Sequence, residues 1–242
     1  MSRSRAFSVA LTGAVVAVLV GCSTGGADAD AGAEARAPST SSTTTEPTTP
    51  PAEPSPESPS PTPTPSKPST RTQPASLTIP EIGLKDLRVV PYEGTTDDWP
   101  GTRIQNEGVA ASPYGSRGGV GPGEIGNYLV TAHRLSAGGP LRELPSLDKG
   151  DTVTVTAAGK IYEYEITTTR STSFRSDRSL AEQRAAVPGH PGRQPTEAMI
   201  TISTCATPED NAAGNFWRDD KGNPEHRIDK IGVLTATTPA TT

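Results

Sequence analysis

The sequence predicts a mainly β domain that begins near residue 76 and is preceded by a long segment expected not to fold. Short runs of alternating apolar and polar residues recur between turn signals from this point onward. Hydrophobic residues make up only 32% of the 242 residues, and the deficit is concentrated in the first third of the chain. Seven or eight such short runs favour a closed barrel over a sandwich. We therefore expect four parts: residues 1–21, 22–75, 76–236 and a short tail at 237–242.

Residues 1–21 have the composition of an export signal. Arg3 and Arg5 precede a mostly aliphatic run over 6–20, which is shorter than the roughly 20 residues of a membrane-spanning helix. The run ends at Gly21-Cys22, an arrangement that resembles the lipobox of bacterial lipoproteins. That resemblance implies cleavage before Cys22 and lipid attachment to it. An uncleaved signal anchor that includes Cys22 is the alternative, and both interpretations place the rest of the chain outside the cytoplasm, on the membrane.

Residues 22–75 are the predicted tether. Between Pro38 and Pro74 the chain consists almost entirely of Pro, Ser, Thr and Glu. Such a segment has too little apolar surface to offset the entropy lost on ordering, and its prolines favour an extended polyproline II path. We expect a disordered spacer or a glycosylated stalk that holds the following domain away from the membrane.

The predicted strands of the domain are short, rich in β-branched and aromatic residues, and bounded by turns. In chain order they are 77–79, 87–90, 127–131, 151–156, 162–166, 199–204 and 228–234. The fourth and fifth flank the turn at Ala158-Gly159 and alternate strictly, which predicts a hairpin with one buried face. Short helical segments are expected at 141–147 and 180–186.

Three residues in this domain have the chemistry of a cysteine enzyme. Cys205, the domain's one cysteine, and His133 each end a predicted strand, and Arg227 begins the last one. An imidazole near a thiol can move its proton, and a guanidinium can stabilise an oxyanion. A lone strand cysteine is more often a small buried hydrophobe, so spacing alone does not establish an enzyme. Arg218, in the long polar segment before Arg227, competes for the cationic role.

Four segments resemble the sortase family of cysteine transpeptidases. Thr201–Cys205 resembles the family's Thr-Leu-x-Thr-Cys signature, and Gly123–Arg134 is similar to the strand that carries its catalytic histidine. Leu144–Asp151 resembles the turn that follows, and Leu77–Leu84 resembles the first strand. The segments occur in family order over about 160 residues. The likeness is greatest to class E sortases of actinobacteria, with class F next.

The resemblance implies an eight-stranded sortase-type β-barrel with one or two short helices. It implies Cys205 as nucleophile, His133 as general acid and base, and Arg227 as the group that stabilises oxyanion and substrate. It also places three residues at the substrate groove: Thr131, Ala132 and Thr204.

The implied reaction cleaves a C-terminal sorting motif of Leu-Ala-x-Thr-Gly or Leu-Pro-x-Thr-Gly type between Thr and Gly. A thioacyl enzyme forms and passes its acyl group to an amine of a cell-wall precursor or pilin. The implied partners are therefore secreted proteins with a C-terminal sorting signal, the amine acceptor, and the membrane through a lipid anchor. No cofactor is implied, and the histidines and cysteine lack the spacing of a metal site. The net charge of −5, without a basic run, gives no indication of nucleic acid.

Two other functions are considered. One is a different cell-wall cysteine enzyme: L,D-transpeptidases have a Ser-x-Gly pattern before the cysteine that this chain lacks, and NlpC-type peptidases place the cysteine before the histidine. The other is a non-catalytic surface β-domain, which would be expected to lose one member of the trio. For a sortase, we expect substrate choice to lie in the long segment 171–197, which leads into the cysteine strand.

Overall fold

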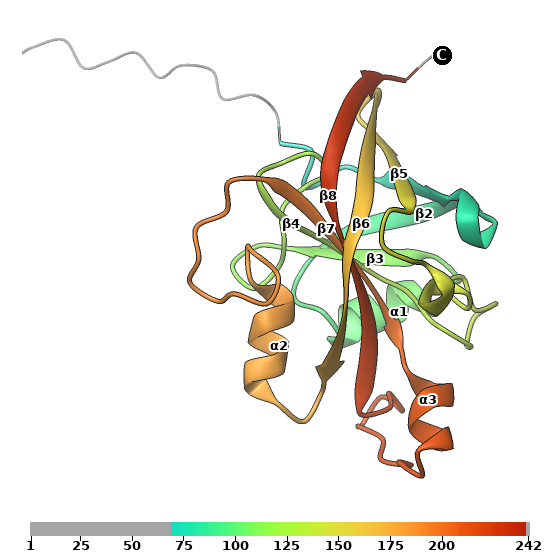
Figure 1. The fold of residues 1–242 in the computed structure, drawn as a ribbon. Helices are drawn as coiled ribbons and strands as arrows, with labels where there is room; N and C mark the ends of the chain where they lie inside the picture. Colours follow the sequence, from blue (N-terminus) through green and yellow to red (C-terminus); the bar gives the residue numbers. More distant parts are fainter. Residues whose placement is uncertain (1–68, 241–242) are drawn as a thin grey trace, which may run out of the picture. The chain divides into compact units, whose positions relative to one another are not determined.

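The structure, a computed structural model, describes residues 69–240, which lie within one compact unit. The expected export signal, Cys22 and most of the expected tether lie outside the described residues. Within 69–240 the chain forms eight strands closed into a barrel, three short α-helices and two 3-10 helices (Figure 1). The prediction of a mainly β, eight-stranded barrel is confirmed. None of the described helices is long and apolar enough to span a bilayer.

The strands follow one another around the barrel in the order β1-β2-β3-β4-β7-β8-β6-β5. Their bounds are β1 Ala75–Ile79, β2 Leu84–Glu93, β3 Ala110–Tyr114, β4 Gly126–Thr131, β5 Thr152–Ala157, β6 Lys160–Ser173, β7 Ala198–Cys205 and β8 His226–Pro239. The pairs β2·β3 and β4·β7 are parallel and the others antiparallel. Strand β3 was not predicted, because its sequence Ala-Ala-Ser-Pro-Tyr contains residues that are depleted in strands.

The helices lie in the connections between strands. They are α1 Trp99–Gln105, α2 Asp177–Arg184 and α3 Thr207–Ala212, with 3-10 turns at Pro80–Ile82 and Leu144–Ser146. The segments expected to be helical at 141–147 and 180–186 correspond to the second 3-10 turn and to α2. Helix α1 was not predicted, although its start carries a capping signal: the Asp98 carboxylate accepts a hydrogen bond from the Gly101 amide.

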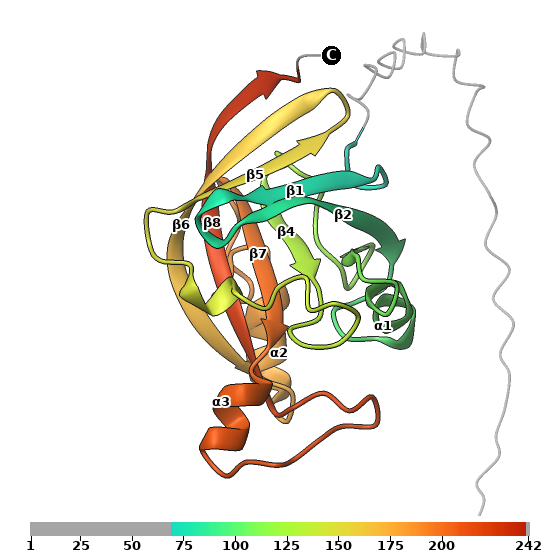
Figure 2. The same cartoon turned by 90° about the vertical axis from the view of Figure 1, so that its right-hand side faces the viewer.

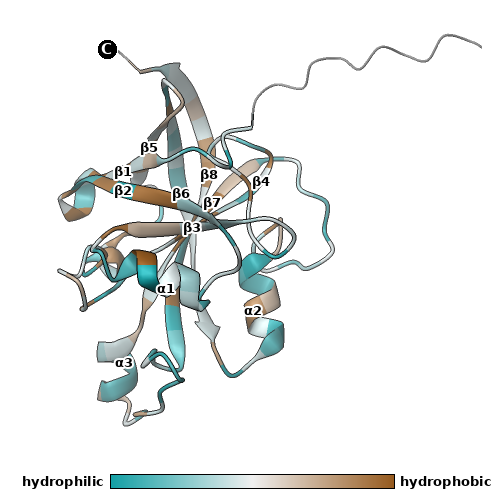
Figure 3. Cartoon of the chain, turned by 180° about the vertical axis from the view of Figure 1, so that it is seen from behind, coloured by the Kyte–Doolittle hydropathy of each residue, from teal (hydrophilic) through white to brown (hydrophobic). Residues whose placement is uncertain are grey.

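Alternation along the strands separates a buried face from an outer one. In the β5–β6 hairpin, Val153, Val155, Tyr164 and Ile166 are fully buried and belong to the core. Figure 3 shows apolar colouring concentrated on strand segments such as β2 and β3. Ile200 and Ile202 of β7 also belong to this core. Because side chains alternate along a strand, Thr201, Ser203 and Cys205 face the outside of the barrel. In Figure 2, α3 and the loop after it lie at the end of the barrel opposite the β5–β6 hairpin.

Candidate active site

The strand register brings the three predicted catalytic residues together. In the parallel pair β4·β7, Thr131 is the partner of Ser203, so two residues further on His133 lies beside Cys205. In the antiparallel pair β7·β8, Cys205 is the direct partner of Arg227. The ends of β4 and β7 and the start of β8 therefore carry all three residues on the outer face of the barrel.

The Cys205 thiol is covered in this conformation. Only 8% of the residue is exposed, and Sγ lies 3.7 Å from Oδ1 of Asn223, in the loop between α3 and β8. Two hydrogen bonds hold Asn223 there, from its amide and from Nδ2 to the Asp219 carboxylate, at 2.8 and 3.0 Å. Burial raises the pKa of Cys205 to about 12, and the nearby Asp219 charge acts in the same direction. At neutral pH this thiol is protonated.

His133 is held by a residue that the sequence did not single out. Its Nε2 lies 2.8 Å from Oδ1 of Asn106, the residue that directly follows α1. With Nε2 donating to this oxygen, Nδ1 is the ring nitrogen left to accept a proton. Partial burial lowers the pKa of His133 below its usual value, so the ring is neutral at pH 7. The pair therefore rests as thiol and imidazole.

Arg227 is the largest of the fully buried side chains, with 2% of the residue exposed. Its Nη2 pairs with Oδ1 of Asp97, from the connection between β2 and α1, and its guanidinium carbon lies 4.9 Å from the Phe174 ring centroid. Burial lowers the pKa of Arg227 to about 10, which still leaves it charged at pH 7. The nitrogens Nε and Nη1 have no hydrogen-bond partner among residues 69–240.

The competitor Arg218 is engaged elsewhere in its loop. Its Nη1 donates to the Trp217 carbonyl and its Nη2 to Asn211 Oδ1, both at 2.6 Å. The register places Arg227, and not Arg218, opposite the cysteine. Neither arginine lines the cavity that contains the thiol.

That cavity has a volume of about 170 Å³. Its walls include Cys205, His133, Arg134, Lys221 and Asn223. Ligand sites for small molecules usually measure about 300 to 1,000 Å³. The cavity in this conformation is therefore too small to hold a pentapeptide.

The three residues expected at the substrate groove are buried and hydrogen-bonded within the sheet. Thr204 Oγ1 donates to the Ala132 carbonyl at 2.8 Å, and Thr131 Oγ1 donates to the Ala111 carbonyl at 3.4 Å. All three are at most 1% exposed, and none lines the cavity. Their contact with substrate stays a prediction.

A buried polar network next to the site also went unnoticed in the sequence. The Asp229 carboxylate, 1% exposed, accepts hydrogen bonds from three side chains that lie on different elements. The donors are Ser203 on β7 at 2.5 Å, Thr172 on β6 at 2.5 Å, and Gln183 on α2 at 2.9 Å. The network fixes α2 against the outer face of β7 and β8, two residues along each strand from Cys205 and Arg227.

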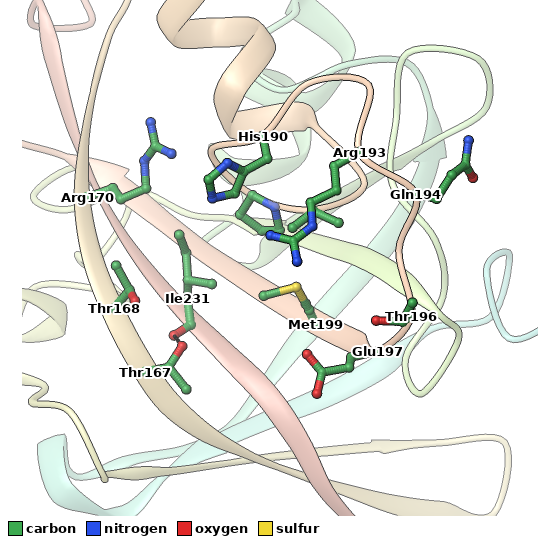
Figure 4. Close-up of a pocket in the computed structure, with 12 residues that line it drawn as sticks. Thr167, Thr168, Arg170, His190, Arg193, Gln194, Thr196, Glu197, Met199 and Ile231 are labelled. Carbon is green, nitrogen blue, oxygen red and sulfur yellow. Dashed lines mark hydrogen bonds between the residues drawn. The ribbon is translucent and has the colours of Figure 1, made fainter.

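A second cavity of about 310 Å³ lies under the connection between α2 and β7 (Figure 4). Met199 and Ile231 contribute apolar side chains to it, and Arg193 and Glu197 are among its charged residues. Met199 is six residues before Cys205 on the same strand, which corresponds to about 20 Å. Among residues 69–240, no group of three or more His, Cys, Asp or Glu side chains is placed to hold a metal ion.

Comparison with known proteins agrees with the fold. A sortase domain model matches residues 77–216, and no curated protein matches the chain. Among solved structures, the SrtA sortase from Actinomyces oris is 21% identical over 69% of this chain and 82% of its own, with a TM-score of 0.52. Sortase E1 from Streptomyces coelicolor, crystallised with a tripeptide in the active site, is 20% identical, with coverages of 71% and 93% and a TM-score of 0.50. The SrtF sortase from Corynebacterium diphtheriae is 18% identical, with coverages of 76% and 95% and a TM-score of 0.50. The sortase domain model spans more than half of the residues of this chain, and the chain therefore belongs to the sortase family.

Proposed function

We propose that this sortase uses Cys205, His133 and Arg227 to cleave a sorting motif and to pass the acyl group to an amine. The supporting observation is the side-by-side placement of the three residues on adjacent strand ends. A structural role explains one buried arginine or one strand cysteine. It does not explain why a neutral imidazole with its own orienting amide lies beside the thiol.

The proposed reaction begins with transfer of the thiol proton to Nδ1 of His133. The sulfur attacks the carbonyl carbon of the motif's threonine. Arg227 donates to the oxyanion through Nε or Nη1, which have no hydrogen-bond partner among residues 69–240 in this structure. The Thr–Gly bond breaks, and His133 returns the proton to the leaving amine. An acceptor amine then attacks the thioester, and the thiolate leaves. The thioester retains the energy of the peptide bond, so the transfer needs no cofactor.

We place recognition of the motif close to the first part of segment 171–197. In Leu-Ala-x-Thr-Gly, the leucine is three residues before the threonine, so it lies at most about 10 Å from the attacked carbonyl. Met199, in the cavity of Figure 4, lies about twice as far along β7, so that end of the cavity is out of the leucine's reach. Phe174, which packs on Arg227, and α2 are nearer. Class E sortases favour Leu-Ala-x-Thr-Gly motifs, and we include this preference for alanine at the second position in the proposal.

We further propose that the chain is an extracytoplasmic enzyme held on the membrane by lipid on Cys22. The motif at Gly21-Cys22 supports this placement. A Cys22→Ala variant is expected to lose lipid labelling and to change its processing or membrane retention. If the variant stays in the membrane fraction with an uncleaved N-terminus, like the unsubstituted chain, the signal-anchor alternative is correct.

The decisive experiment combines a Leu-Ala-x-Thr-Gly peptide with the full chain and with Cys205→Ala. The unsubstituted chain is expected to cleave the peptide and to show a mass increase that hydroxylamine removes, because hydroxylamine cleaves thioesters. Cys205→Ala is expected to show neither. Cleavage by the variant at more than about a hundredth of the normal rate would show that Cys205 is not the nucleophile. If Leu-Pro-x-Thr-Gly reacts faster, the motif assignment changes while the chemistry stands.

A further inference from the structure

Lys221 shares the small cavity with Cys205 and His133. It is two residues from Asn223, whose Oδ1 is 3.7 Å from the thiol, so the Cα atoms of Lys221 and Asn223 are at most about 7 Å apart. The Lys221 side chain is only 14% exposed. Its Nζ lies 5.3 Å from the Trp99 ring centroid and 2.6 Å from Asp220 Oδ1. Lys221 thus contributes to the wall of the cavity, while its amine lies between Trp99 and Asp220 and is largely shielded from solvent.

The other described lysines are placed differently. Among residues 69–240, Lys221 is the one lysine that lines the cavity with the thiol. Nζ of Lys230 is buried and hydrogen-bonded to the Pro145 and Leu147 carbonyls. Lys160 lines a cavity on a different part of the barrel, and Lys149 is exposed. Among these lysines, Lys221 is therefore the candidate acceptor for an acyl group on Cys205.

We propose that Lys221 is an internal amine acceptor, so that the enzyme acylates itself at this residue when no external amine is present. The inference rests on the proposed function, because it needs the thioester on Cys205. Nζ, once deprotonated, attacks the thioester carbonyl; the C–S bond breaks and a C–N amide bond forms. The sulfur leaves as a thiolate, and the proton released from nitrogen returns to it through His133. Atoms and electrons balance without another reactant.

Placement within one small cavity favours this transfer. An amine carried by a residue that lines the cavity does not have to be captured from solution, which removes much of the entropic cost of a bimolecular step once Nζ turns from Asp220 toward the thioester. The contact with Asp220 acts in the opposite direction, because the amine has to leave this 2.6 Å hydrogen bond before it can attack. Self-acylation is therefore slower than transfer to an abundant acceptor. The amide product leaves a peptide attached to the loop that covers Cys205.

The test is incubation of the full chain with a Leu-Ala-x-Thr-Gly peptide, with and without an added amine such as triglycine. Hydroxylamine treatment follows, because it removes thioesters and leaves amides intact. Intact-mass measurement and peptide mapping are expected to find a hydroxylamine-resistant acyl group on Lys221. The added amine is expected to reduce this adduct at least tenfold. Lys221→Arg, which keeps the charge, is expected to lose it, and the matched control Lys149→Arg is expected to keep it.

The outcomes separate the two hypotheses. If neither a sensitive nor a resistant adduct forms, the proposed function is wrong. If the sensitive adduct forms but the peptide map finds no resistant acyl group on Lys221, the inference is wrong and the proposed function stands. A resistant adduct spread equally over several lysines also contradicts the inference. The peptide map of the unsubstituted chain decides the question even if Lys221→Arg folds poorly.

Discussion

Alkylation of Cys205 measures directly how far its surroundings suppress the thiolate. The pKa of about 12 compares with about 8.5 for an ordinary cysteine. At pH 8 the thiolate fraction falls from roughly a quarter to roughly one in ten thousand, a factor of about 2,000. A more basic thiolate is intrinsically more nucleophilic, which recovers a factor of roughly 30 to 40 over this interval. The free enzyme is therefore expected to react with iodoacetamide roughly 50- to 100-fold more slowly than the same cysteine in urea-unfolded protein.

The assay is a time course of iodoacetamide labelling, read at the Cys205 peptide by mass spectrometry between pH 7 and 10. In the folded protein the rate is expected to rise about tenfold per pH unit over this whole range, because it lies below the raised pKa. Asp219→Asn removes the second-largest cause of the raised pKa and weakens the hold on Asn223, so the variant is expected to react faster at each pH. Asp220→Asn is the matched control, since the exposed Asp220 does not act on the thiol pKa.

Two results would refute this reasoning. One is a folded-state labelling rate equal to that of the unfolded protein at pH 8, which would mean that the thiol is neither covered nor poorly ionised. The other is a rate that levels off near pH 9, which would show an ordinary cysteine pKa. If Asp220→Asn is labelled faster and Asp219→Asn is not, Asp219 is not the carboxylate that suppresses the thiolate.

Three further predictions concern the groups around the thiol. Asn106→Ala removes the 2.8 Å contact to His133, so kcat for peptide cleavage is expected to fall about tenfold with KM little changed. Equal kcat values for the variant and the unsubstituted chain would mean that Asn106 does not position the His133 ring. Asp97→Asn leaves the buried Arg227 without its paired carboxylate, so the free energy of unfolding in urea is expected to fall by about 3 kcal/mol. A fall of less than about 0.5 kcal/mol would show that the Asp97–Arg227 pair does not stabilise the fold. The lowered pKa of His133 keeps the ring neutral at pH 7, so the rate of thioester formation is expected to decline only below pH 6.5. A decline that already begins above pH 7 would contradict the direction of the pKa shift.

The fold was predictable where a local pattern decides it. The β5–β6 hairpin follows from strict alternation around Ala158-Gly159, and both strands were predicted. Strand β3 has no such pattern: it is held by pairing with β2 along its whole length, and that pairing depends on distant residues. The barrel itself was only weakly favoured by strand number, because closure requires β1 to pair with β5, some 80 residues away in the chain.

The site was predictable to the extent that its chemistry is written in residue type and strand position. Cys205 and His133 stood out as reactive side chains at strand ends, but their adjacency comes from the parallel register of β4 and β7. Asn106 and Asp97 carried no signal, because an amide after a helix and a carboxylate before one usually serve as caps. Their contacts to His133 and Arg227 bridge 27 and 130 residues of sequence. Only the folded chain creates those contacts.

Two loops cover the proposed catalytic residues, and they contact each other. Asp97, just before α1, covers Arg227, and Asn223, in the loop after α3, covers the Cys205 thiol. The stacking of Lys221 on Trp99 joins the two loops across the site. In the proposed reaction, a sorting peptide has to displace both covers, because the cavity beneath them measures only about 170 Å³. Part of its binding energy is therefore spent on opening the site and uncovering the thiol. In the proposed reaction, the same two loops would shield the thioester from water until an amine arrives, if they closed again over the acyl group.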